Sequence, residues 1–392
     1  MDDEYLDISL RLLDPSDIDD FMVWATDDKV SKFCSWDTYK SKEDAMSFIV
    51  NVVVPHRWFR AICLKGRPVG AISVAPNEGN ESCRAELGYV LASEYWGKGI
   101  VARAVKLVAP TVFVEWPHLE RLEALVDVEN SGSQRVLDKV GFKREGVLRK
   151  YFLLKGRPRD MVMFSLLRTE LHCLFEEFHE SVTVIDKASE SLNGATEMDD
   201  EYLDISLRLL DPSDIDDFMV WATDDKVSKF CSWDTYKSKE DAMSFIVNVV
   251  LPHPWFRAIC LKGRPVGAIL VRPNEGNESI RAKLGYVLAF EYWGKGIVAR
   301  AVKLVASTIF VEWPHLERLE ALVDVENSGS QRVLDKVGFK REGVLRKYFL
   351  LKGRPRDMVM FSRLRTELHC LFEEFHESVT VIDKVSESLD GL

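Results

Sequence analysis

The sequence lacks the features of several large protein classes. Its seven cysteines form no C-x-x-C pair, and none stands at metal-ligand spacing from a histidine. No apolar run approaches the roughly 18 residues that cross a bilayer. The acidic N-terminus, MDDEYLD, has neither the pattern of a secretory signal nor that of an arginine-rich transit peptide. We therefore expect no metal and no membrane contact, and a reducing compartment, the cytoplasm, with the nucleus also open.

Positive charge is also scarce. The chain has 52 Lys and Arg against 63 Asp and Glu, which gives a formal net charge of −11. Because nucleic-acid binding needs a basic face, this balance predicts no nucleic-acid partner. It is compatible with a cationic substrate, and equally with an acidic surface that only keeps the protein soluble.

The dominant feature of the sequence is a repeat. Met1 corresponds to Met198, and nearly every residue of the first half recurs 197 positions later. This period is far too long for a solenoid unit, so each copy is a whole domain. A tandem duplication and a joined gene model produce the same sequence. The copies differ at Arg57/Pro254, Ser73/Leu270, Ala75/Arg272, Cys83/Ile280, Glu86/Lys283, Ser93/Phe290 and Leu166/Arg363, among other positions.

The segment that follows each copy is polar and without apolar periodicity, which is typical of a linker. We expect proteolysis there to release two separately folded fragments. Before it, Leu167, Leu171, Leu174, Phe175 and Phe178 fall on one helical face, which indicates a packing helix or a dimer seam. The predicted organisation is a domain over residues 1–180, a linker over 181–202, a second domain over 203–377 and a polar tail over 378–392.

Within a copy, local patterns predict an alternation of strands and helices. Asp14 before Pro15, and Ser41 with Asp44, are typical helix starts. Apolar alternation around Gly-containing turns predicts hairpins. In the first copy the expected strands cover about residues 7–13, 58–65, 69–75, 84–92, 119–128, 146–154 and 159–167. The expected helices are one that begins at Pro15, two that cover about 42–54 and 100–113, and a short one that begins at the cap residues near Asn130 and ends at Gly141.

A glycine-rich turn precedes the third of these helices. The stretch EYWGKGIVARAVKLV occurs at residues 94–108 and again at 291–305. The first amides of a helix have no backbone acceptor, so such a turn offers an anion site that glycine leaves open to phosphate. A tight loop with nothing bound is the alternative. The sequence contains neither GxxxxGK[ST] nor GxGxxG.

The order strand, W-G-K-G, helix, strand and DVENSGSQRVLDKVGF resembles the GNAT N-acetyltransferase superfamily, particularly its RimJ/RimL-type branch. The resemblance spans about residues 6–166 and 203–363. It implies an α+β or α/β fold of two tandem GNAT-like domains, each with a mixed, mostly antiparallel central sheet flanked by helices. It also implies acetyl-CoA as co-substrate, and the two copies could form an intramolecular pseudo-dimer.

The resemblance implies two groups of cofactor-binding residues. Trp96 and Val101 replace the usual Gln or Arg and the usual small residue, and we expect Val101 to crowd the phosphate by about 1 kcal/mol. Asn130 and Ser133 either cap a helix or also line the coenzyme channel. The implied cofactor-binding set is Trp96, Gly97, Lys98, Gly99, Ile100, Val101, Asn130 and Ser133, with Trp293, Gly294, Lys295, Gly296, Ile297, Val298, Asn327 and Ser330 in the second copy.

Acetyl transfer to an amine needs a neutral nucleophile. An amine with a pKa near 10.4 is neutral in about 1 molecule in 2,500 at pH 7, so supplying the free amine costs roughly 4.6 kcal/mol and a general base is useful. Strand alternation favours Glu86 as the base, with a solvated edge carboxylate as its alternative and Glu123 as second choice. Leu137 stands where family members often carry a tyrosine acid, and Tyr151 is the candidate substitute. Tyr89 alternates away from Glu86 and is interpreted as packing.

Two functions remain in competition. One is an acetyl-CoA-dependent N-acetyltransferase that acts on a protein N-terminus, a polyamine or a small amine. The other is a non-catalytic acyl-CoA-binding or scaffold protein on the same fold, particularly for the second copy. Lys283 reverses the charge of Glu86 at the matching position, so we expect the first copy to be the better catalyst.

Overall fold

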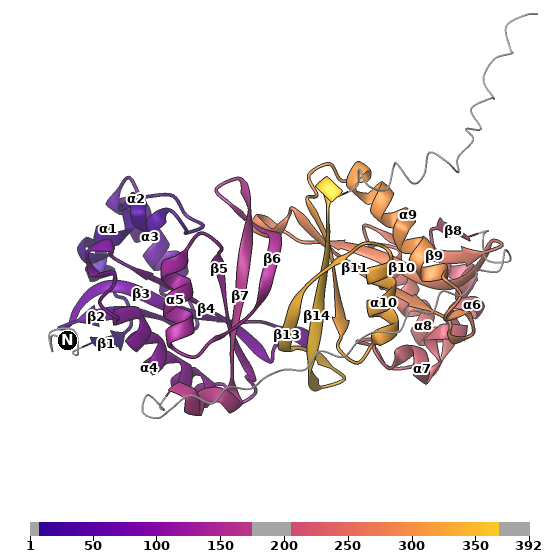
Figure 1. The fold of residues 1–392 in the computed structure, drawn as a ribbon, viewed down its shortest axis with the longest axis horizontal. Helices are drawn as coiled ribbons and strands as arrows, with labels where there is room; N and C mark the ends of the chain where they lie inside the picture. Colours follow the sequence, from indigo (N-terminus) through magenta and orange to yellow (C-terminus); the bar gives the residue numbers. More distant parts are fainter. Residues whose placement is uncertain (1–7, 175–204, 368–392) are drawn as a thin grey trace, which may run out of the picture.

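The computed structural model describes residues 8–174 and 205–367. The described residues of copy 1 (residues 1–197) run from indigo to magenta in Figure 1, and those of copy 2 (residues 198–392) run from rose through orange to yellow. In copy 1 the elements are β1 (Ile8–Arg11), η2 (Pro15–Asp17), α1 (Ile18–Ala25), α2 (Asp28–Ser31), α3 (Lys42–Phe48), the π-helical η3 (Ile49–Val53), β2 (Phe59–Leu64), β3 (Arg67–Pro76), η4 (Gly79–Glu81), β4 (Arg84–Leu91), η5 (Ser93–Tyr95), α4 (Ile100–Glu115), β5 (Arg121–Asp127), α5 (Ser131–Lys139), β6 (Lys143–Leu154), β7 (Arg157–Leu167) and η6 (Arg168–Leu174).

Copy 2 repeats this order of elements. They are β8 (Ile205–Arg208), η8 (Pro212–Asp214), α6 (Ile215–Ala222), α7 (Asp225–Ser228), α8 (Lys239–Phe245), η9 (Ile246–Val250), β9 (Phe256–Leu261), β10 (Arg264–Pro273), η10 (Gly276–Glu278), β11 (Arg281–Leu288), η11 (Phe290–Tyr292), α9 (Ile297–Glu312), β12 (Arg318–Asp324), α10 (Ser328–Lys336), β13 (Lys340–Leu351), β14 (Arg354–Leu364) and η12 (Arg365–Glu367).

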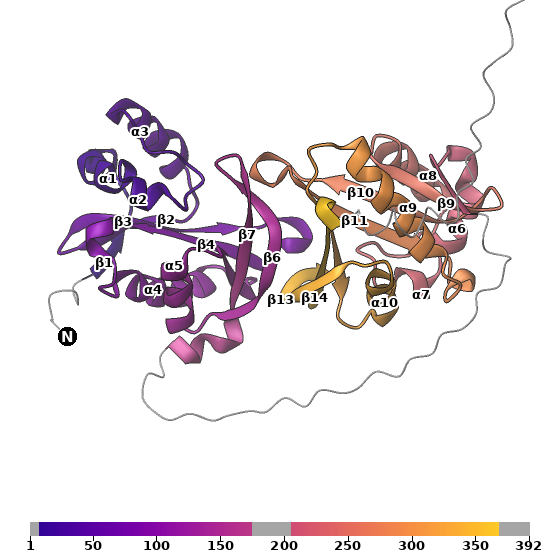
Figure 2. The same ribbon diagram turned by 45° about the horizontal axis from the view of Figure 1, so that its top comes forward.

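Each copy is built on a mixed sheet covered by helices on both faces. In copy 1 the strand order is β1-β2-β3-β4-β5-β7-β6, antiparallel except for the parallel β4–β5 pair. Alternation along β2 divides the core, because Ile62 packs with α4 and α5 while Ala61 and Cys63 pack with α1 and α3. Figure 2 shows these two helix groups on opposite sides of the sheet. The predicted mixed, mostly antiparallel sheet with flanking helices is confirmed.

Local signals fix the helix starts as the sequence predicted. Asp14 accepts a hydrogen bond from Ser16 N and forms a capping box with Asp17, and Ser41 caps α3 through Asp44 N. The predicted trailing helix is a 3-10 helix as far as Leu174, and its Leu171 packs against the core. Phe175, Phe178 and the predicted linker lie outside the described residues.

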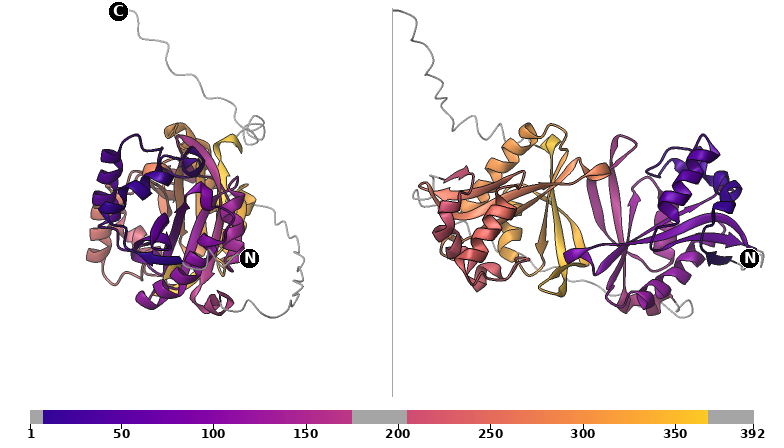
Figure 3. Two further views of the ribbon diagram at one scale, coloured as in Figure 1. Left: turned by 90° about the vertical axis from the view of Figure 1, so that its left-hand side faces the viewer. Right: turned by 180° about the vertical axis from the view of Figure 1, so that it is seen from behind.

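The two copies join into one sheet of 14 strands, with β6 beside β13 at the centre, as Figure 3 shows from behind. The residues paired across the seam are Gly146 and Gly343. A Cβ at either glycine would lie 2.3 Å from the backbone oxygen of Glu342 or Glu145 on the other copy. Only glycine therefore allows the two backbones to approach this closely.

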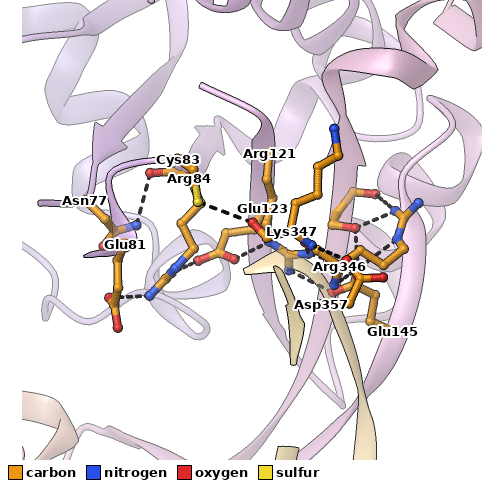
Figure 4. A network of polar contacts seen from close by, with 11 residues as sticks. Asn77, Glu81, Cys83, Arg84, Arg121, Glu123, Glu145, Arg346, Lys347 and Asp357 are labelled. Carbon is orange, nitrogen blue, oxygen red and sulfur yellow. Dashed lines mark hydrogen bonds and ion pairs between the residues drawn. The ribbon is translucent and has the colours of Figure 1, made fainter. Parts of the chain in front are cut away.

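Arginines link the copies reciprocally beside this seam. The Arg346 guanidinium lies 2.9 Å from Glu145 and 2.5 Å from Glu170, and Arg149 binds Glu342 at 2.8 Å and Glu367 at 2.5 Å in the same way. Figure 4 shows Arg121 in the same network, where it binds Glu145 and donates to the Arg346 carbonyl at 2.8 Å.

Both copies also contribute to one buried apolar cluster between them. Its buried members are Leu148, Tyr151, Met161, Met163, Leu345, Tyr348, Met358 and Met360. The copies therefore share a sheet and part of their core. This contact argues against our expectation that proteolysis releases two fragments that fold separately.

Candidate active site

Strands β4 and β5 separate part of the way along copy 1. Their parallel register covers only the pairs from Arg84–Arg121 to Glu86–Glu123, although β4 continues to Leu91 and β5 to Asp127. Beyond Glu86 the two strands no longer pair with each other, and two adjoining cavities are lined by residues of both strands or of the elements that follow them. A sheet that opens between parallel strands provides a site for ligands at their carboxyl ends.

The glycine turn lies at the mouth of this opening. Gly97 and Gly99 have φ values of 77° and 75°, a region that L side chains rarely adopt, and no atom lies within 4 Å of a Cβ built on either. Gly99 is the N-cap of α4, so the next amides of this 16-residue helix have no acceptor within the helix. The Trp96 indole donates to the Leu91 carbonyl at 2.9 Å and holds the turn against β4.

We call the cavity beside this turn the turn cavity; its volume is about 570 Å³. Lys29, Arg135 and Lys139 are exposed around it, and together with the α4 amides they favour an anionic ligand. The implied cofactor residues that line it are Trp96, Gly97, Gly99, Ile100, Val101, Asn130 and Ser133.

Three of the implied cofactor residues need comment. Lys98 does not line the turn cavity, and its ammonium lies 5.2 Å from the centre of the Tyr95 ring. Val101 lines the cavity but is only 8% exposed and also packs in the hydrophobic core, and the expected crowding of phosphate by its side chain stays a prediction. Asn130 both caps α5, by accepting from Ser133 N at 3.1 Å, and lines the cavity.

The second cavity, which we call the aromatic cavity, has a volume of about 390 Å³. Glu86 and Asp127 lie in its wall, and the Asp127 carboxylate pairs with Arg159 at 2.6 Å. Aromatic side chains form much of the rest, namely Phe21, Trp24, Phe33, Trp36, Tyr39, Phe48, Phe59, Tyr89 and Phe152. The two cavities share the lining residues Phe33, Cys34, Tyr89, Val90, Asn130 and Ser133.

The Glu86 carboxylate has a pKa raised to about 7. It is open to solvent through the cavity, but the surrounding protein removes much of its hydration, and this desolvation is the largest cause. Repulsion from Glu123 and Glu278 raises the pKa further, and attraction to Arg84 opposes the rise. A carboxylate with a pKa near 7 is suited to accept a proton at neutral pH.

The other two candidate catalytic residues lie elsewhere. Glu123 is 1% exposed and its carboxylate pairs with the guanidinium groups of Arg84 and of Arg121, the latter at 2.7 Å (Figure 4). Tyr151 is 3% exposed in the cluster between the copies, where the Arg281 guanidinium lies 3.9 Å from its ring centre. Neither residue lines the cavities described above, so this geometry does not support Tyr151 as the acid or Glu123 as the base.

Sequence reasoning missed Tyr89 and Cys34, which lie where the cavities meet. The Tyr89 hydroxyl donates to the Ser133 carbonyl at 3.2 Å, and burial raises its pKa to about 12. Burial also raises the pKa of the Cys34 thiol to about 11. Both groups are therefore protonated at neutral pH. Tyr89 alternates away from Glu86 along β4 and borders the cavities only because β4 and β5 separate there. The alternation of apolar and polar residues that marks Glu86 therefore gives no signal for it.

Copy 2 keeps the glycine turn and changes the acceptor side. Gly294 and Gly296 have φ values of 79° and 75°, and Asn327 caps α10 as Asn130 caps α5. At the position of Glu86, the Lys283 ammonium pairs with Glu81 of copy 1 at 3.4 Å, and Arg272 lies directly opposite on β10.

Two further substitutions in copy 2 add apolar bulk. Leu270 replaces Ser73, which lines the aromatic cavity of copy 1. Phe290 replaces Ser93 and packs edge-on against Trp293 of the turn, with ring centres 5.1 Å apart. The expectation that Phe290 narrows the approach to this turn stays a prediction.

Within residues 8–174 and 205–367, no group of three or more His, Cys, Asp or Glu side chains is arranged to hold a metal ion. No helix in the same ranges is long and apolar enough to cross a membrane.

Comparison with known proteins places this site in a family. The uncharacterised N-acetyltransferase p20 of Bacillus licheniformis is 43% identical over 90 residues, which is 23% of this chain and 50% of p20. The uncharacterised N-acetyltransferase YoaA of Bacillus subtilis is 28% identical over 165 residues, 41% of this chain and 92% of YoaA. Spermidine N(1)-acetyltransferase of Escherichia coli K12 is 33% identical over 85 residues, 22% of this chain and 45% of that enzyme.

For p20 and the spermidine enzyme, the chain therefore spans about half of the relative's length or less. The family described as "Acetyltransferase (GNAT) domain" matches both copies, at residues 7–143 and 204–340. These two matches enclose the opened strands, the glycine turn and the capped helix of each copy, and the chain belongs to the GNAT acetyltransferase family.

Proposed function

We propose that the chain transfers an acetyl group from acetyl-CoA to a primary amine, and that copy 1 carries the activity. The observation that supports this proposal most directly is Glu86, a carboxylate with a pKa near 7 in a cavity that adjoins the glycine turn. Such a carboxylate can accept the proton of an ammonium group, and the acyl donor would be held in the adjoining cavity.

The turn cavity fits the phosphates of a coenzyme. The space beside Gly97 and Gly99 is open, the amides at the start of α4 point out of the helix, and Lys29 and Arg135 supply positive charge. Acetyl-CoA would supply an activated thioester. Asn130 and Ser133, at the boundary of the cavities, are suited to line the path towards Glu86.

Proton transfer would use two residues of copy 1. The Glu86 carboxylate accepts a proton from the ammonium form of the acceptor, which then has the lone pair that it needs for attack. The Tyr89 hydroxyl, which is protonated at neutral pH and lines both cavities, is the candidate donor to the departing sulfur. Cys34 remains a thiol at neutral pH, which favours direct transfer over an acyl-cysteine route.

The acceptor that the aromatic cavity fits is an amine on an apolar stem. Its aromatic walls can pack against methylene groups and lie beside a cation, and Glu86 attracts the ammonium group. Among the relatives, the spermidine enzyme is named for an amine acceptor. A polyamine, a small amine and a protein N-terminus all belong to this class.

The test compares the same substitution in the two turns of the full chain. Gly99→Val should lose one of two coenzyme A binding equivalents in calorimetry and abolish thiol release with a panel of amines, because valine disfavours the required φ and fills the phosphate space. Gly296→Val is the matched control, and should lose the other equivalent while thiol release continues. Unchanged stoichiometry in the double variant would refute coenzyme binding at the turns.

The second candidate function, non-catalytic coenzyme binding, is favoured for copy 2. The Lys283 ammonium, paired with Glu81 and opposite Arg272, cannot accept a proton at pH 7 and repels a cationic acceptor. We expect Glu86→Lys to abolish turnover by the full chain. In a Gly99→Val background, Lys283→Glu should restore a measurable rate through copy 2, measured as thiol release. If Glu86→Lys keeps full turnover, copy 2 or another base performs the reaction.

A further inference from the structure

The aromatic cavity of copy 1 is not formed by copy 1 alone. Glu278, in η10 of copy 2, is the lining residue that comes from the other copy. The η10 turn packs against β6 of copy 1, next to the seam. Glu278 also lies close enough to Glu86 for their charges to interact, which contributes to the raised pKa of Glu86.

The matching contact in the opposite direction is different. Glu81, in η4 of copy 1, binds Arg84 of its own copy at 2.5 Å and Lys283 of copy 2 at 3.4 Å. Its side chain is 25% exposed. Glu278 binds Arg281 at 2.6 Å, faces Glu86 instead of a lysine, and has 39% of its side chain exposed. Both glutamates thus pair with one arginine of their own copy, but Glu278 has no lysine facing it as Glu81 has, and more of its side chain is exposed.

We propose that Glu278 completes the acceptor site of copy 1 and selects acceptors that carry a second positive charge. This inference rests on the proposed function. Glu86 would receive the amine that reacts, Glu278 would hold the other cationic group, and the aromatic walls would contact the aliphatic chain between them. Glu278 acts here as a specificity residue that positions the acceptor, and it takes no part in proton transfer.

A pair of acceptors that differ only in the second charge tests the proposal. In the full chain, kcat and KM are measured for n-butylamine and for the terminal diamine of the same length, with acetyl-CoA saturating. We expect the diamine to have the higher kcat/KM. Glu278→Gln should reduce the diamine value about tenfold, mainly through KM, and leave the monoamine value within about twofold.

Glu275→Gln is the matched control, because Glu275 lies on the same loop, is exposed, and does not line the cavity. It should leave both substrates unchanged. An equal fall for both amines in Glu278→Gln would indicate a structural role and overturn the proposal, as would a wild-type chain with no preference for the diamine.

A binding measurement separates this proposal from the proposed function. The diamine is titrated calorimetrically into the wild-type chain and into Glu278→Gln, each saturated with coenzyme A. If no amine is turned over, the enzymatic proposal fails, while weaker diamine binding by Glu278→Gln still supports the shared site. If turnover is normal and diamine binding is equal in both proteins, the shared site alone is refuted.

Discussion

In the proposed mechanism, the protonation of Glu86 sets the pH range in which copy 1 can work. Its pKa is raised to about 7, so the carboxylate that accepts a proton becomes the minor form below that pH. With an acceptor whose ammonium pKa is near 10.4, we expect kcat/KM to rise about tenfold per pH unit up to pH 7 and then to level off.

The Glu86→Gln variant provides the control for this profile. It can use only the free amine, so its kcat/KM should be roughly 100-fold lower at pH 7 and should continue to rise towards the pKa of the amine. Rate measurements over this pH range with one small amine check both profiles. A wild-type profile that rises without a break at pH 7 would remove Glu86 from the mechanism.

At the same scale, the sequence indicates the candidate base more readily than a candidate acid. Glu86 was predicted because strand alternation places it on the side of β4 with Gly88 and Val90, and all three line the aromatic cavity. Tyr151 was chosen because it follows the helix, but the inter-copy contact buries it. Tyr89 reaches the cavities only because β4 and β5 separate beyond Glu86, and nothing in the alternation of one strand reports that separation.

At the scale of the element, α4 contains an internal comparison. Pro110 lies within this helix, while the matching residue in α9 is Ser307, whose hydroxyl donates to the Leu304 carbonyl at 2.8 Å. A proline inside a helix removes one backbone hydrogen bond and costs up to about 3 kcal/mol. We expect Pro110→Ser to raise the free energy of unfolding by about 1–3 kcal/mol in chemical denaturation.

The reverse substitution, Ser307→Pro, should lower that free energy by a similar amount. If neither change has an effect, the surrounding packing already accommodates the proline. The test concerns stability alone, because Pro110 is more than two turns away from the glycine turn along α4.

Most elements could be predicted because their signals are local. Caps such as Asp14, Ser41 and Asn130 fix helix starts through the next few residues, and the hairpins are marked by alternation and by turns such as Lys155–Gly156, both with positive φ. No comparable signal predicts that the segment after Leu167 forms a 3-10 helix. Its apolar residues fit one face of an α-helix as well as they fit a 3-10 helix.

At the scale of the whole molecule, Gly146 allows β6 and β13 to lie close together at the seam. A methyl group there would meet the Glu342 carbonyl at 2.3 Å, so Gly146→Ala should push β6 away from β13. We expect the free energy of unfolding to fall by about 1–3 kcal/mol, measured by chemical denaturation. Gly329→Ala is the control, because its Cβ would make an ordinary contact at 3.7 Å and alanine favours the helix α10.

A Gly146→Ala chain as stable as wild type would show that the seam is looser than described. The seam itself could not be predicted from the sequence. β6 is one strand of a hairpin, and its partner β13 is the same strand 197 positions later, so no sequence pattern distinguishes an exposed edge from a joined one. The need for glycine at position 146 is evident only when the backbone of the other copy lies beside it.

The contacts across the seam are reciprocal, although the two copies can acquire substitutions independently. Arg149 binds Glu342 as Arg346 binds Glu145, which is the pattern of a two-fold homodimer. In a homodimer, one mutation alters both sites at once, and a charge reversal at the proposed base would change both copies of the site. Here the two halves are encoded separately, so copy 2 carries Lys283 while copy 1 has Glu86 at the matching position. Covalent linkage thus lets one half diverge while the other half keeps its own site unchanged.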